Sequence, residues 1–131
     1  MGNDPQNWTA NAETLFEGSK VLKREMERSV QSGQLTSYSF TAWIEVMLTA
    51  FGIECLIKAI WLKQGNQLAR DGIYVPIIER ERHQLVKLCG AAGVALNKQE
   101  VEVLERMRDI ALSIGRYPIP LRAGQSEGFR S

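Results

Sequence analysis

Glu54 and Lys58 are the first residues whose types and spacing suggest chemistry, because they interrupt a long apolar segment over residues 42–62. They lie four positions apart, so on a helix they share one face. If that face is exposed, the pair is an ion pair at the edge of the core, contributing about 0.2 to 0.5 kcal/mol. If it is buried, the Glu54 carboxylate needs a partner and would orient a basic residue from another helix at a site. The sequence leaves both interpretations open.

His83 is the only histidine of the chain. A zinc site with several imidazole ligands is therefore excluded, and Cys55 and Cys89 lack metal-ligand spacing, so we expect no metal and no cofactor. A histidine that acts as a general base needs a substrate proton within hydrogen-bond reach. The structural alternative is that His83 caps backbone groups or meets a carboxylate. Its charged neighbours are Glu79, Arg80, Glu81, Arg82 and Lys87.

Arginines near the C-terminal end of the apolar pattern are the third set of candidates. Arg108 is expected off the centre of an apolar helical stripe, on a flank shared with Val101 and Leu112. Such a flank is typical of a partner surface or a half-covered cleft, and the alternative is a solvated helix face. Arg116, followed by Tyr117, would meet the negative end of the helix or point towards an anionic ligand.

Four helices are expected to position these side chains, in an all-α, up-and-down bundle. The first begins at Asp4 and Pro5, a side-chain cap followed by proline at the first helical position, and runs to about Val30. The second is apolar nearly all round, which places it at the centre of the bundle. The fourth opens with the capping-box pair Asn97 and Glu100. The second and third helices are predicted over about residues 36–64 and 76–89, with a loop over residues 66–76. The fourth is predicted from Asn97, and Pro118 and Pro120 forbid its continuation.

The composition indicates one globular domain of ordinary size. The chain has 131 residues, 44% of them apolar and 24% charged, and we predict one domain over residues 1–121 with a disordered tail over 122–131. A net charge of +1 gives no overall attraction to nucleic acid or membrane, so any anion site must be local. Charges inside residues 42–62 argue against a membrane span. Two isolated cysteines in apolar segments indicate buried free thiols and a cytoplasmic protein.

Three motifs in order carry a resemblance to a known family: residues 52–59, residues 83–88, and Arg108-Asp109 leading to Arg116, Tyr117 and Pro118. Over about residues 10–121 the chain resembles the HEPN superfamily of four-helix domains. The resemblance implies an up-and-down bundle, often dimeric, in which the last long helices of two protomers face each other. It also implies relatives that are metal-independent ribonucleases of toxin, antiphage or RNA-processing systems.

The family's catalytic motif is incomplete in this chain. It consists of an arginine, an adjacent polar residue and a histidine that is separated from the arginine by four to six residues. Arg108 and Asp109 match its first two elements, but Ser113, Ile114 and Gly115 occupy the positions where the histidine should fall. The missing imidazole argues against cleavage by the family mechanism more strongly than against binding.

Two hypotheses follow, and the first is preferred. It is a non-catalytic HEPN-like homodimer that binds RNA, a nucleotide or a protein partner encoded nearby. Its alternative is a metal-independent ribonuclease of a toxin or antiphage system that uses His83, Arg108 and Glu54 in an altered geometry. The residues expected to bind a ligand or partner are Arg108, Asp109, Arg116, Tyr117, Glu54 and Lys58.

Overall fold

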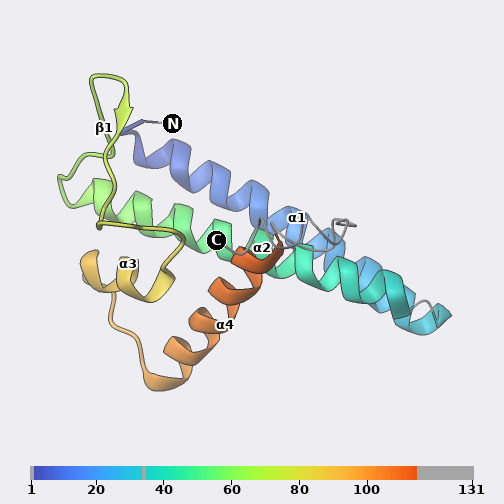
Figure 1. Ribbon diagram of the computed structural model, residues 1–131. Helices are drawn as coiled ribbons and strands as arrows, with labels where there is room; N and C mark the ends of the chain where they lie inside the picture. Colours follow the sequence, from blue (N-terminus) through green and yellow to red (C-terminus); the bar gives the residue numbers. More distant parts are fainter. Residues whose placement is uncertain (1, 34, 115–131) are drawn as a thin grey trace, which may run out of the picture.

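The computed structural model describes residues 2–33 and 35–114 of the chain (Figure 1). Within these ranges it is an all-α bundle of four helices with one very small hairpin, which confirms the predicted fold class. No helix in the described ranges is both long and apolar enough to cross a membrane. The elements are α1 (Pro5–Ser32), α2 (Leu35–Lys63), β1 (Ala69–Arg70), β2 (Ile73–Tyr74), α3 (Leu85–Ala91) and α4 (Lys98–Ile114).

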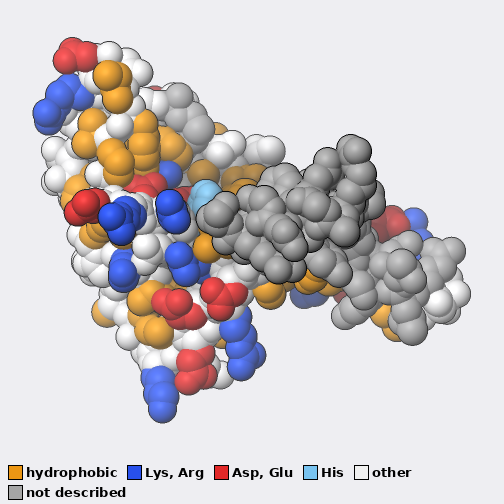
Figure 2. All heavy atoms as spheres, viewed as in Figure 1, with side chains coloured by type: hydrophobic (Ala, Val, Ile, Leu, Met, Phe, Trp, Pro, Cys, Tyr) orange, Lys and Arg blue, Asp and Glu red, His pale blue; other side chains and the backbone are white. Residues whose placement is uncertain are grey.

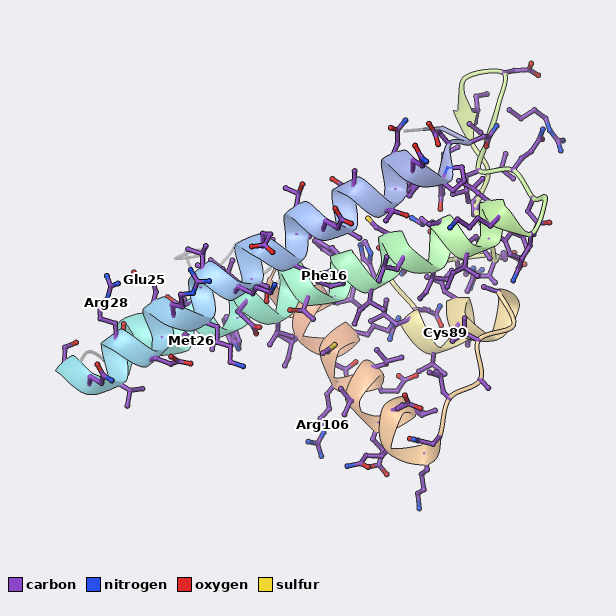
Figure 3. All side chains as sticks on the ribbon, turned by 180° about the vertical axis from the view of Figure 1, so that it is seen from behind. Phe16, Glu25, Met26, Arg28, Cys89 and Arg106 are labelled. Carbon is purple, nitrogen blue, oxygen red and sulfur yellow. The ribbon has the colours of Figure 1, made fainter. Side chains whose placement is uncertain are left out.

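Helices α1 and α2 form a long antiparallel pair (Figures 1 and 3). The predicted start of α1 is confirmed, because the Asp4 side chain accepts a hydrogen bond of 2.9 Å from the backbone N–H of Gln6. The helix ends at Gly33, whose φ of 80° lies in the left-handed region that glycine tolerates. Between the two helices, the ring of Phe16 packs so closely on Gly52 that a Cβ there would lie 2.5 Å from it.

Helix α2 is the centre of the bundle, as its apolar composition predicts, and packs against α1, α3 and α4. The smaller helices α3 and α4 cover one side of it, while the α1–α2 pair extends beyond them at the end that carries Gly33 (Figure 1). The main core cluster lies where α2, α3 and α4 meet. Its buried members are Ala50, Ile57, Leu85, Leu88, Cys89, Ala92, Leu104 and Ala111.

The predicted third helix is wrong in its first half. Helix α3 begins at Leu85, whereas residues 76–84 form turns instead of the predicted helical start. The physical reason is that residues 79–84 contain no apolar side chain, so a helix there would have no face to bury. The preceding loop has the expected turn at Asp71 and Gly72, flanked by β1 and β2, whose two-residue strands are too short to show alternation.

Helix α4 opens with the predicted capping box. The Asn97 side chain accepts a hydrogen bond of 2.7 Å from the backbone N–H of Glu100, and the Glu100 carboxylate accepts one of 2.9 Å from that of Asn97. The predicted disordered tail at residues 122–131 lies outside the described residues.

Candidate anion-binding site

A buried carboxylate and a half-exposed imidazole form the centre of the site. Glu54 is 6% exposed, and its Oε2 lies 2.8 Å from His83 Nδ1. Because a carboxylate only accepts hydrogen bonds when ionised, Nδ1 is the donor. The His83 side chain is 40% exposed and its ring packs against Phe51 at a centroid distance of 4.9 Å. Among the described residues Nε2 has no hydrogen-bond partner, so this nitrogen remains available to a ligand.

Lys58 lies beside this pair in an enclosed cage. Its Nζ is 3.7 Å from Glu54 Oε1 and 3.3 Å from Glu81 Oε1. The same atom lies 5.1 Å from the centroid of the Trp8 ring and 4.9 Å from that of Tyr74, in cation–π geometry. Burial lowers the pKa of Lys58, but Glu54, Tyr74 and Glu81 together raise it above its ordinary value. Lys58 is therefore a charged residue enclosed by protein groups.

Glu81 joins the cage to the hairpin and to the loop that carries His83. The Tyr74 hydroxyl donates to both Glu81 oxygens, at 2.8 and 3.0 Å, and the Ile77 backbone N–H donates to Oε2 at 2.9 Å. Burial, with the Glu81 hydrogen bond adding to it and Lys58 opposing it, raises the pKa of Tyr74 to about 12. The phenol is therefore held in its neutral, proton-donating form.

The backbone around His83 is strained. We call residues 77–84 the His83 loop. In it Arg80, Arg82 and His83 have φ values of 54°, 33° and 57°, in the left-handed region that non-glycine residues rarely adopt. Both arginines are exposed. Figure 2 shows the one histidine side chain at the surface with Lys and Arg side chains gathered near it. Strained backbone of this kind concentrates at functional sites.

No family model, curated protein or solved structure matches this chain. The resemblance to HEPN domains therefore stays a prediction, and the argument for function rests on the site itself.

The structure brings together three of the predicted site residues: Glu54, Lys58 and His83. This confirms that Glu54 is buried and paired with a basic residue, although that residue comes from a loop and not from another helix. His83 meets a carboxylate, the contact that the structural alternative names, and an oriented general base makes the same contact. Arg116 and Tyr117 lie outside the described residues.

Arg108 is half-buried on α4, and Asp109 beside it is exposed. The prediction placed Arg108 off the centre of the core stripe, on a flank. The buried residues Leu104 and Ala111 lie four and three positions from it, so this flank borders the inner face. Its Nε is buried and has no hydrogen-bond partner among the described residues. No hydrogen bond or ion pair within that part of the chain joins it to Glu54, Lys58 or His83.

An apolar groove of about 480 Å³ lies apart from this site, between α2, the end of α3, and α4. Leu56 and Val103 lie on its walls. On an ideal helix Arg108 lies about 140° from Val103, and Glu54 about 160° from Leu56. None of Arg108, Glu54 and Lys58 is among the residues that line the groove.

Sequence reasoning missed Glu81, Tyr74 and Trp8. The sequence held one signal for Glu81. The polar run over residues 79–84 has no apolar positions, so it is a poor helix and indicates a loop. Nothing local marks Trp8 or Tyr74 as neighbours of Lys58, since they come from distant parts of the chain. Among the described residues, no three His, Cys, Asp or Glu side chains come together in a way that could hold a metal ion.

Proposed function

We propose that this protein is a non-catalytic, HEPN-like module that binds the phosphate groups of RNA or of a nucleotide at the His83 loop. The observation that carries the proposal is the hydrogen bond between Glu54 and Nδ1 of the half-exposed His83, in a loop that also carries the exposed Arg80 and Arg82. Arginine N–H groups are suitable donors to phosphate oxygens, and so is the Nε2–H of His83 when the ring carries both protons. A net charge of +1 gives no overall pull on an anion, so this local cluster supplies the attraction.

Arg108 adds support from α4. A buried guanidinium N–H without a partner is costly, and buried polar groups are almost always satisfied. Among the described residues, the Nε of Arg108 is such a group. Within the resemblance, Arg108 is also the arginine that matches the family motif, which is a reason to include it in the same site.

The binding test compares two variants in the His83 loop with a matched variant far from it. Arg82→Ala and His83→Ala each remove one proposed phosphate contact. Arg28→Ala removes the same charge as Arg82→Ala, but Arg28 pairs with Glu25 near the end of the α1–α2 pair farthest from α3 (Figure 3). Fluorescence anisotropy with a labelled single-stranded RNA, and competition by a nucleoside diphosphate, should show roughly tenfold weaker binding for the two loop variants.

Arg28→Ala should bind like the wild type, with a small general loss at low salt. Equal affinities of all three variants would mean that the attraction is non-specific and would contradict the proposal. If RNA binds and the nucleoside diphosphate does not compete, the ligand is a polynucleotide and not a free nucleotide.

The second candidate is a metal-independent ribonuclease, and one observation favours it. Glu54 holds Nδ1 of His83 as an orienting carboxylate holds a general base, which would leave Nε2 to accept a proton from a 2′-hydroxyl group. Incubation with total RNA in the presence of a chelator distinguishes the candidates. Cleavage by the wild type that is lost in His83→Ala and Arg108→Ala would favour the enzyme, whereas equal background cleavage by all three proteins would eliminate it.

The resemblance further leads us to infer a cytoplasmic homodimer that works with a protein encoded beside it. Sedimentation velocity tests the oligomeric part of this inference. A monomer at all concentrations would contradict it and would leave the anion site itself unaffected.

A further inference from the structure

Glu81 fastens the His83 loop to the rest of the molecule. Its side chain is 12% exposed, although both of its sequence neighbours are exposed arginines. The carboxylate accepts hydrogen bonds from the Tyr74 hydroxyl and the Ile77 N–H and lies 3.3 Å from Lys58 Nζ. These partners come from β2, from the start of the loop and from α2. One inward-pointing carboxylate thus connects the loop to two other elements.

The same residue accounts for the strained backbone on either side of it. Arg80 and Arg82 have φ values of 54° and 33°, and a non-glycine residue keeps such values only where surrounding contacts enforce them. The Glu81 backbone carbonyl also accepts a hydrogen bond of 2.8 Å from the N–H of Gln84, the residue that precedes α3. With the Glu81 side chain bound inwards and its carbonyl bonded within the turn, the adjacent arginines are left at the surface and His83 is brought onto Glu54.

We propose that Glu81 is a positioning residue: it holds Arg80, Arg82 and His83 in the arrangement that binds the anionic ligand, without contacting that ligand. The inference rests on the proposed function and deepens it. The Glu81 carboxylate is turned away from the solvent-exposed arginines and is occupied by Lys58 and Tyr74. It acts through the loop and not through its charge.

An electrostatic role and a positioning role of Glu81 predict opposite changes in ligand affinity when its carboxylate is removed. Removing a negative charge near an anion site should tighten binding if only charge matters. Removing the contacts that hold the loop should weaken binding. Glu79 provides the matched control, because it is an exposed glutamate two positions earlier in the same loop. Glu79→Ala removes the same charge from nearly the same place but leaves every Glu81 contact intact.

The experiment measures the affinity of Glu81→Ala and Glu79→Ala for the labelled single-stranded RNA. We expect Glu81→Ala to bind roughly tenfold more weakly than the wild type, about the smallest effect that residues supporting the ligands of a metal site have on affinity. Glu79→Ala should bind equally well or more tightly. The conservative variant Glu81→Gln keeps an oxygen that can accept from Ile77 and should recover part of the loss. Glu81→Ala binding as tightly as Glu79→Ala would overturn the proposal.

Two further measurements keep the test decisive if Glu81→Ala does not fold or if the wild type binds no RNA. Tyr74→Phe removes only the hydroxyl that donates to Glu81 and keeps the ring over Lys58. The ¹⁵N resonances of the His83 ring report directly on the Nδ1 hydrogen bond to Glu54. A wild type that binds neither RNA nor nucleotide refutes the proposed function. Positioning by Glu81 is then upheld if the His83 resonances shift in Glu81→Gln and Tyr74→Phe, and overturned if they do not.

Discussion

Helix α2 carries two glutamates on opposite faces, and their surroundings differ in kind. Glu45 faces α1, where its Oε1 accepts a hydrogen bond of 2.8 Å from the Ser19 hydroxyl, and the hydroxyl of Thr49 lies 3.5 Å away. Glu54 faces the other way and meets the His83 imidazole and the Lys58 ammonium. The first carboxylate has neutral partners, all on helices, whereas the second has ionisable partners, one of them in a strained loop.

This difference indicates that Glu45 takes part in helix packing, whereas Glu54 belongs to the candidate site. Hydroxyl groups held on two packed helices satisfy Glu45 and fix how α1 lies on α2, close to the tight contact between Phe16 and Gly52. The partners of Glu54 hold an imidazole at the surface, where a ligand can reach it. Strained backbone of the kind that carries His83 concentrates at binding and catalytic sites.

The largest effect is expected when each carboxylate is removed in turn. Glu54→Ala leaves a buried ammonium and an imidazole without their common partner, and should lower the free energy of unfolding by about 3 kcal/mol. Glu45→Ala loses only hydrogen bonds with hydroxyl groups and should cost about 1 kcal/mol. Urea denaturation measures both values.

RNA affinity, measured under conditions where both variants are folded, completes the comparison. Glu54→Ala should weaken RNA binding and Glu45→Ala should leave it unchanged. Similar losses of stability and of affinity in the two variants would mean that the two faces of α2 do not differ in the way described.

A smaller effect is expected from the glycine that allows α1 and α2 to approach. A Cβ at Gly52 would lie 2.5 Å from the Phe16 ring, so Gly52→Ala should lower the free energy of unfolding by about 2 kcal/mol through overpacking. Gly90 in α3 is the matched control, because a Cβ there meets nothing within 4 Å. Gly90→Ala should therefore be neutral or stabilising by about 0.5 kcal/mol.

Thermal and urea unfolding measure both glycine variants. RNA affinity should be unchanged in Gly52→Ala, because Gly52 belongs to the Glu45 face. A loss of affinity without a loss of stability would contradict the assignment of that face to packing.

The parts of the fold that depend on near neighbours were predictable from the sequence. The cap at Asp4 and the capping box at Asn97 and Glu100 each involve residues two or three positions apart, so their chemistry is visible in a short segment. The central place of α2 follows from its composition. The predicted beginning of the third helix was wrong, because the prediction joined the apolar residues on both sides of the charged run at 79–84 into one helix.

The site was only half predictable, because most of its contacts join residues that are far apart in the sequence. Helix spacing put Glu54 and Lys58 on one face and offered burial with a basic partner as one of two alternatives. The partner, His83, lies 29 positions further along the chain, and only the fold brings it to the carboxylate. Glu81, Tyr74 and Trp8 contribute through contacts among an irregular loop, a hairpin and the start of α1, which no periodic pattern encodes.

The smallest expected effect is a loss of stability in alkaline solution that comes from the Glu54 side of α2. The folded protein raises the pKa of Tyr74 to about 12, and an unfolded tyrosine has a pKa of about 10. The folded state therefore holds the phenol proton more tightly, and this contribution to stability is complete below about pH 10 and is lost as the pH rises towards 12. The raised pKa of Lys58 acts in the same direction, because its ammonium is also favoured by folding.

Urea midpoints measured from neutral to strongly alkaline pH should thus stay level and then fall above about pH 10. Tyr74→Phe has no phenol to titrate at this position and should show a shallower fall, although its stability at neutral pH is lower by the lost hydrogen bonds to Glu81. Ser19→Ala, which alters the Glu45 face, should lose stability equally at every pH and keep the wild-type slope. If the urea midpoints of Tyr74→Phe and the wild type fall with the same slope, the proton of Tyr74 is not linked to folding. The two faces of α2 would then differ only in their ability to bind a ligand.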